Sequence, residues 1–217
     1  EAIPLAKESM LVTSAGNESS PSLWAREHAQ GLNLLARIYL ELGRPIEALP
    51  LCEAGLKLFD QEAESSSTDE SWVIYYSMTK MLTGGAYLRL GRLSEALPHL
   101  EEVQLQSERG YENDPELWSD IYIGSLNSRA SICLASGYPR EAIPALQTAQ
   151  IILRDNFDCS SIVYAGTLAN LGTAQALIGQ VDEALPLFEE ALSIFQKTFG
   201  SDPKSWNFGY VQYLIAY

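Results

Sequence analysis

Residues 179–192 read GQVDEALPLFEEAL, and the tetrapeptide EALP at 183–186 decides the fold because it recurs along the whole chain. Four more copies, with either Leu or Ile at the third position, begin at Glu1, Glu47, Glu95 and Glu141. Successive copies are 46, 48, 46 and 42 residues apart. A period of this size is typical of proteins built from stacked structural repeats.

A glycine marks the middle of each unit. In four units the tetrapeptide follows, by four residues, a glycine that closes an apolar helical run: Gly43, Gly91, Gly137 and Gly179. Glycine suits the left-handed position just past the end of a helix. We therefore predict that each unit consists of a helix A, a tight turn at the glycine and a helix B.

The start of helix A repeats as well. A tryptophan lies 19 residues before three of the glycines, and a second ring lies 15 before all four: Trp24, Trp72 and Trp118, then His28, Tyr76, Tyr122 and Tyr164. Ser or Asp followed by Pro, an N-terminal helix signal, occurs at 20–21, 114–115 and 202–203, shortly before Trp24, Trp118 and Trp206. Pro45 and Pro139 are predicted to open helices B, and the tetrapeptide prolines to lie near the first turn of helix B.

Apolar residues follow a helical period of three and four within the units, and no stretch alternates with a period of two. The chain is therefore predicted to be all-α, a superhelical solenoid of antiparallel helix pairs. We expect ten helices, in a partial repeat (helix B) at 1–16, repeats at 20–60, 68–109, 114–155 and 158–200, and a partial repeat (helix A) at 202–217. Because each end falls within a repeat, further repeats or flanking domains are expected in the full-length protein.

The units resemble the tetratricopeptide repeat (TPR). The family's small residue and aromatic residue near the end of helix A are matched by Ala36 with Tyr39 and by Gly84 with Tyr87; weaker matches are Ala130 with Cys133 and Gly172 with Gln175. The fourth unit is similar to the long repeats of kinesin light chains, through 169–172, 182–192 and 199–203. The resemblance implies that small residues let helices A and B approach closely.

The resemblance also implies a concave groove lined by helix A residues that lie off the core stripe, where an extended peptide would bind. Carried over by position, its lining is predicted to be Gln30, Asn33, Arg37, Met78, Met81, Arg89, Asn127, Ser131, Asn170 and Thr173. The Lys and Asn residues with which chaperone-binding repeats hold a C-terminal carboxylate are missing. Capture of a chaperone C-terminus is therefore not expected.

Composition and charge restrict the classes of partner that are expected. The 28 acidic residues outnumber 14 basic ones, giving a formal net charge of -14, so nucleic acid and anionic membrane are not expected as partners. No apolar run is long enough to cross a bilayer. Three scattered cysteines match neither a zinc site nor a disulfide framework. Their scarcity favours a reducing compartment, and a cytoplasmic protein is expected.

No catalytic, metal or cofactor site is predicted. His28 stands where other repeats have Tyr and is interpreted as a packing residue, and His99 as a surface residue without a second metal ligand. Cys133 is expected to be a small core residue. The Trp–Tyr pairs lie on the apolar stripe, so a core position is favoured over an aromatic ligand cage.

Two functions remain open. The first is a non-catalytic scaffold that binds a partner protein or peptide in the groove. The alternative is a regulatory or sensor module of a larger enzyme, such as a protease or a signalling ATPase. The acidic linker at 60–70 carries a Ser/Thr run that could be phosphorylated, although solvated loop is the simpler interpretation.

Overall fold

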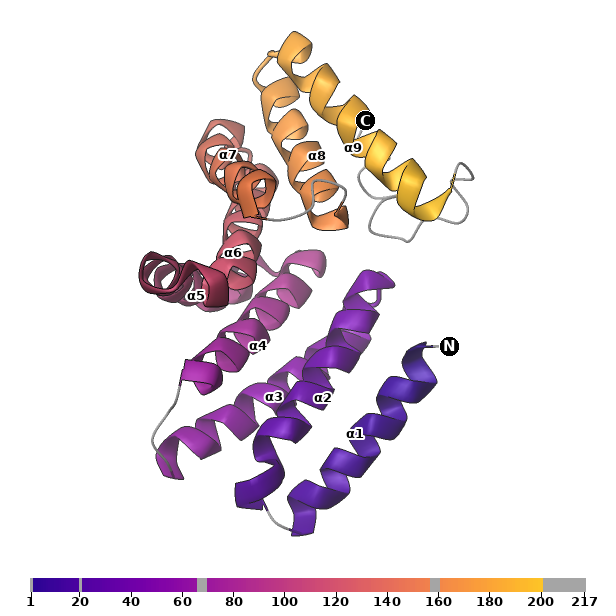
Figure 1. Cartoon of the computed structure of the whole chain (residues 1–217), viewed down its shortest axis with the longest axis vertical. Coiled ribbons are helices and arrows are strands. Elements are labelled where there is room, and N and C mark those ends of the chain that lie inside the picture. Colours follow the sequence, from indigo (N-terminus) through magenta and orange to yellow (C-terminus); the bar gives the residue numbers. More distant parts are fainter. Residues whose placement is uncertain (1, 20, 66–69, 157–160, 201–217) are drawn as a thin grey trace. The chain divides into compact units, whose positions relative to one another are not determined.

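The computed structural model describes residues 2–19, 21–65, 70–156 and 161–200. Within these ranges the chain forms nine α-helices and no strand (Figure 1). The helices are α1 (Ala2–Ser19), α2 (Pro21–Glu41), α3 (Pro45–Ser65), α4 (Glu70–Arg89), α5 (Leu93–Asn113), α6 (Pro115–Ala135), α7 (Pro139–Asn156), α8 (Ile162–Leu177) and α9 (Val181–Phe199). The predicted all-α solenoid is confirmed. The partial repeat predicted at 202–217 lies outside the described residues.

The helices form two compact units, 1–106 and 107–217, and the boundary falls within α5. In the first unit α2 packs against α1, α3 and α4, and α3 also packs against α4. The second unit repeats this arrangement, because α7 packs against α6 and α8, α8 packs against α9, and α6 also contacts α8. Consecutive helices therefore pack as antiparallel pairs, and the helices A of neighbouring repeats also touch: α2 with α4, and α6 with α8.

The turns between helices A and B form around glycine, as predicted. Gly43, Gly91, Gly137 and Gly179 all have a φ between 68° and 87°, a region that side chains other than glycine rarely adopt. At the first turn the Gly43 amide donates to the Leu40 carbonyl over 3.0 Å and the Arg44 amide to the Tyr39 carbonyl over 2.8 Å. This is the Schellman pattern, which satisfies the last carbonyls of helix A, and the other three turns repeat it.

Two of these turns carry an additional arginine. The Arg44 guanidinium lies 4.9 Å from the centre of the Tyr39 ring, and that of Arg92 lies 4.7 Å from the Tyr87 ring. Each arginine also forms an ion pair with the glutamate of the tetrapeptide, Glu47 or Glu95. The repeats in which the aromatic residue is replaced also lack the arginine, having Cys133 with Tyr138 and Gln175 with Gln180. The aromatic ring and the arginine thus occur together, as a cation–π contact requires.

The close approach of helices A and B depends on small residues. A Cβ on Gly84 would lie 2.4 Å from Leu100 Cγ, and a Cβ on Gly172 would lie 3.0 Å from the Phe188 ring. Ala36 and Ala130, at the same position in the other repeats, are fully buried. Small residues at this position are therefore required by the packing of each helix pair.

Prolines mark the helix starts, with one difference from the sequence prediction. Pro45 and Pro139 open α3 and α7, and Pro115 opens α6, where Asp114 Oδ1 accepts a hydrogen bond from the Leu117 amide over 3.1 Å. The tetrapeptide prolines lie inside helices B at the sixth residue, in the second turn rather than the first: Pro50, Pro98, Pro144 and Pro186. All four are exposed, so the carbonyls that they leave without an amide donor can be hydrated.

Two of the tryptophans, Trp24 and Trp118, pack against a glycine of the preceding helix, a contact that was not predicted from the sequence. A Cβ on Gly110 would lie 2.2 Å from the Trp118 ring, and a Cβ on Gly16 would lie 2.5 Å from the Trp24 ring. Trp118 and Trp72 are buried, as expected. The core position expected for Trp24 is wrong, because this residue is 36% exposed.

Candidate binding groove

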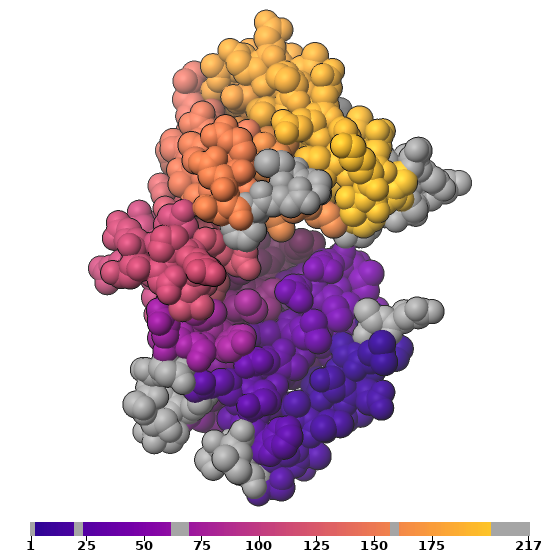
Figure 2. Space-filling view, viewed as in Figure 1, coloured from indigo at the N-terminus to yellow at the C-terminus, as the bar shows by residue number. Residues whose placement is uncertain are grey.

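A groove of about 360 Å³ lies between α1, α2 and α4 of the first unit. α1 and α2 lie side by side on the face seen in Figure 2. Apolar side chains from α2 and α4 and several polar side chains share the lining, which consists of Ser9, Glu27, Gln30, Gly31, Asn33, Leu34, Arg37, Tyr75, Met78 and Leu82. Helix α4 contributes Tyr75, Met78 and Leu82, whose spacing of three and four residues places them on one side of the helix.

The lining is amphipathic. Leu34 keeps 40% of its side chain exposed, and Met78 and Leu82 are half-buried opposite it on α4. Glu27 and Arg37 are exposed, and neither has an ion-pair partner among the described residues. The groove therefore combines apolar surface with one acidic and one basic side chain, both able to bind an outside group.

A buried side-chain hydrogen bond joins the helices A beside this groove, and its acceptor bonds in turn to the backbone of its own helix. Asn33 Nδ2 on α2 donates to Thr79 Oγ1 on α4 over 2.7 Å, and the Thr79 hydroxyl donates to the Tyr75 carbonyl over 2.8 Å. Asn33 is 4% exposed and Thr79 is fully buried. The Asn33 Oδ1 is also buried and accepts no hydrogen bond from the described residues.

The second unit contains the equivalent pair. Asn127 Nδ2 on α6 donates to Thr167 Oγ1 on α8 over 3.0 Å. Both asparagines stand ten residues before a turn glycine, and both threonines stand twelve before the next one. The intervening repeat has Met81 at the asparagine position. These amides thus hold neighbouring helices A together.

Four of the ten predicted groove residues lie together in the structure, and the others lie elsewhere. Gln30, Asn33, Arg37 and Met78 come together in the groove of the first unit. Met81 and Arg89 lie on α4 outside its lining, and Arg89 Nη1 donates to the Leu40 carbonyl over 2.9 Å. In the second unit the hydroxyls of Ser131 and Thr173 donate to carbonyls of their own helices, and Asn170 is buried with 9% exposure.

Several lining residues are not among those predicted from the sequence. Glu27, Leu34, Tyr75 and Leu82 all face the groove, and none was selected. The helical period offered a signal for all four, because Tyr75 and Leu82 continue the stripe of Met78 on α4, and Leu34 lies one turn from Gln30 on α2. Glu27 lies one turn before Gln30 on the same side of α2.

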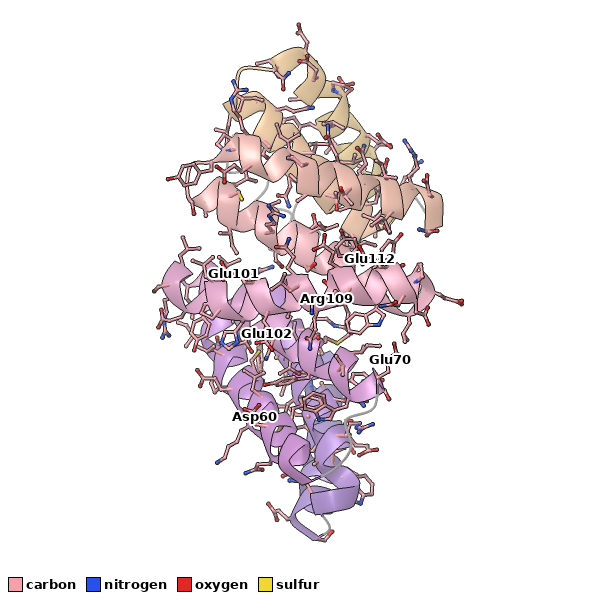
Figure 3. All side chains as sticks on the ribbon, turned by 90° about the vertical axis from the view of Figure 1, so that its left-hand side faces the viewer. Asp60, Glu70, Glu101, Glu102, Arg109 and Glu112 are labelled. Atoms are coloured by element: carbon pink, nitrogen blue, oxygen red, sulfur yellow. The ribbon has the colours of Figure 1, made fainter. Side chains whose placement is uncertain are left out.

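A second polar cluster lies in the first unit away from the groove. The Lys80 ammonium lies 4.1 Å from the centre of the Tyr76 ring and forms an ion pair with Glu102, and the Tyr76 hydroxyl donates to Asp60 Oδ1 over 2.6 Å. Figure 3 shows Asp60 and Glu102 on the same side of this unit. Burial, followed by the contact with Asp60, raises the pKa of Tyr76. Lys80 is 7% exposed, so its partners compensate for burying a charge.

Burial dominates the surroundings of Cys52, His28 and His99. Burial raises the pKa of the Cys52 thiol to about 12, so Cys52 is not a thiolate nucleophile at neutral pH. His28 is half-buried, and its Nδ1 lies 3.1 Å from Thr13 Oγ1, in line with a packing role. The surface position expected for His99 is wrong, because it is half-buried and stacks on the Tyr87 ring, with 6.1 Å between ring centres.

The described ranges contain neither a metal-binding cluster nor a helix suited to span a membrane. No group of three or more His, Cys, Asp or Glu residues there is placed to hold a metal ion. None of the described helices is both long enough and apolar enough to cross a membrane.

Family comparison identifies these repeats. One tetratricopeptide-repeat family matches residues 122–197, and a second matches residues 29–54 and 81–102. Together the matched stretches cover more than half of the chain. The chain belongs to the tetratricopeptide-repeat superfamily. In TPR terms, α2, α4, α6 and α8 are the helices A, and the groove lies on the helix A side of the first unit. No curated protein matches the sequence.

Solved structures agree with this assignment. Two crystal structures of the nearly identical TPR-like repeats of a putative kinesin light chain from Podosopora anserina match this chain, with TM-scores of 0.55 and 0.52. In both cases the sequence identity is 20%, and the match covers 91% of this chain and 94% of the other. At this identity the likeness concerns the fold, which is that of kinesin-light-chain-like TPR repeats.

Proposed function

We propose that this chain is a non-catalytic TPR scaffold that binds a partner protein or peptide in the groove between α1, α2 and α4. Stacked helical repeats generally serve as protein-interaction scaffolds, because their stacking creates extended binding surfaces. The observation that carries the proposal is the convergence of Gln30, Arg37 and Met78 around exposed apolar surface in one groove. Peptide binding by the six other predicted residues, which lie outside this lining, remains a prediction.

The lining suits a peptide more than a small polar metabolite. Leu34, Met78 and Leu82 offer apolar surface, and methionine adapts to partners of varied shape. The Gln30 amide can both donate to and accept from a peptide backbone. Arg37 supplies a cation for an acidic group. The Asn33 and Asn127 amides, by contrast, are assigned to holding the helices A together. A reducing compartment such as the cytoplasm is part of this proposal, since Cys52 and Cys133 are free thiols.

The experiment is a peptide-display selection on the purified chain, followed by affinity measurement of the enriched peptides on variants. Met78→Glu and Arg37→Ala alter the groove, and Arg140→Ala removes an exposed arginine of α7 as a matched control. We expect the groove variants to weaken binding by about tenfold or more and the control to bind as the wild type does. Enriched peptides that bind all three variants equally would overturn the groove as the binding site.

A basic partner attracted only by the net charge of -14 is the competing explanation. Diffuse attraction weakens as salt screens it, whereas packed contacts in a groove largely persist. The affinity of the enriched peptides is therefore measured at low and at physiological salt. Loss of most binding at physiological salt would favour the competing explanation.

A further inference from the structure

Two adjacent glycines in the interior of α4 have very different surroundings. Gly84 is required by the fold, because a Cβ there would lie 2.4 Å from Leu100 Cγ. A Cβ on Gly85 would have no heavy atom within 4 Å, and Gly85 is half-exposed. Glycine inside a helix destabilises it relative to alanine, and the packing of the described residues does not require glycine at position 85. Its absent side chain leaves α4 backbone open to an approaching molecule.

Gly85 lies on the groove side of α4. Tyr75, Met78 and Leu82 line the groove, and the next position on the same helical stripe is 85. Gly85 stands six residues before its turn glycine, as Arg37 does in the preceding repeat. The bond between Asn33 and Thr79 sets the register of the two helices A. Gly85 therefore continues the stripe of α4 past Leu82, at the repeat position of Arg37, just beyond the residues that line the groove.

The separation of Glu27 and Arg37 sets the number of peptide residues that can reach from one charge to the other. Glu27 and Arg37 are ten residues apart on α2, which corresponds to about 15 Å along a helix. An extended peptide rises about 3.3 Å per residue, so four to five residues span this distance. Leu34 lies between the two charges on α2, and its exposed apolar surface faces the middle of such a peptide.

We propose that the groove binds an extended peptide whose backbone passes over Gly85, with an acidic side chain on Arg37 and a basic side chain four to five residues away on Glu27. Glycine is the residue that lets a second backbone approach most closely, and charge-assisted hydrogen bonds at both ends orient the peptide. This inference rests on the proposed function, to which it adds the charge pattern and the crossing point.

The probes are four fluorescent hexapeptides with capped termini: Lys-Ser-Leu-Ser-Leu-Asp, its reverse, and the two versions whose ends are both Lys or both Asp. One of the two mixed-charge peptides is expected to bind at least about tenfold more tightly than either like-charged peptide. In the double variant Glu27→Arg/Arg37→Glu, the preference between the two mixed-charge peptides should invert. Equal binding of all four probes, or binding of none, would overturn the inference.

Gly85→Ala tests the crossing point. The added methyl group meets no atom of the protein and raises helix propensity, so the melting temperature should rise while the affinity for the preferred hexapeptide falls at least about tenfold. Ser193→Ala, on the exposed side of α9, raises helix propensity away from the groove and should leave affinity unchanged. Unchanged affinity in Gly85→Ala with weaker binding in Arg37→Ala would overturn the crossing point but leave the proposed function standing. If no groove variant affects binding, both fail.

Discussion

The Asn33 amide on α2 donates to the Thr79 hydroxyl on α4 over 2.7 Å, in a site where both side chains are buried. This bond joins the helices A of neighbouring repeats across 46 residues of sequence. Asn127 and Thr167 repeat it in the second unit. A polar tie inside an apolar stack favours one alignment of the two helices, because any shift along the helix axis would leave buried polar groups without a partner.

Thr79→Val is expected to destabilise the chain by about 1–3 kcal/mol, because the isosteric change leaves the buried Asn33 Nδ2 without its acceptor. The double variant Asn33→Leu/Thr79→Val should recover part of this loss, since both polar partners are then gone. Chemical denaturation of the two single variants and the double variant provides the measurement. Thr148→Val, at the more exposed hydroxyl of α7, is the control, with an expected change within about 0.5 kcal/mol. Additive effects at 33 and 79 would contradict the coupling.

Gly84→Ala and Gly85→Ala place the same methyl group on adjacent residues and should change stability in opposite directions. At Gly84 the new Cβ would lie 2.4 Å from Leu100, and overpacking of this kind costs about 1–3 kcal/mol. At Gly85 the Cβ meets open space, and alanine should stabilise the helix by roughly 0.5–1 kcal/mol. Thermal unfolding by circular dichroism checks both. Stabilisation of both variants would show that helix propensity, and not packing, governs this part of α4.

Much of the fold could be predicted because its signals are local. Gly43 and its equivalents predict the turns, because the turns need a backbone conformation that glycine adopts most readily. Pro45 and Pro139 predict the starts of two helices. Gly84 was assigned to the close approach of helices A and B through the resemblance to TPR repeats. The seating of Trp118 on Gly110 was missed, although the same eight-residue spacing links Gly16 to Trp24.

The site was less predictable because it depends on how far each helix is rotated about its axis. Gln30 and Asn33 are neighbours on one side of α2 and both line the groove, yet the Asn33 amide is bonded to Thr79 of α4 and so is assigned to holding the helices together. No local signal separates the two positions. The recurrence of Asn ten residues before one glycine and Thr twelve before the next was the available clue, and it becomes meaningful only once α2 and α4 are known to touch.

Ala142→Leu is expected to destabilise the second unit. Ala142 is fully buried in α7, in a cluster with Ala130 and Leu146, so a larger side chain has no space and should cost about 1–3 kcal/mol. Ala54→Leu adds the same atoms at an exposed position of α3 and should leave the melting temperature nearly unchanged. Wild-type unfolding of Ala142→Leu would show that helices A and B are not closely packed there.

His99 should make stability depend on pH. Burial and then the nearby Lys80 lower the pKa of His99, and their effect exceeds the opposing one of Glu102 and Glu53. The folded chain therefore binds a proton at His99 less readily than the unfolded chain, in which the pKa is about 6.5. The resulting stability is fully present above pH 6.5 and is lost as the pH falls through the lowered pKa of the folded state.

His99→Phe retains a ring to stack on Tyr87 but removes the titrating group. In urea titrations between pH 7.5 and 5, the wild type should lose stability more steeply than His99→Phe, while His28 titrates in both. Parallel pH profiles for the two proteins would contradict a lowered pKa at His99.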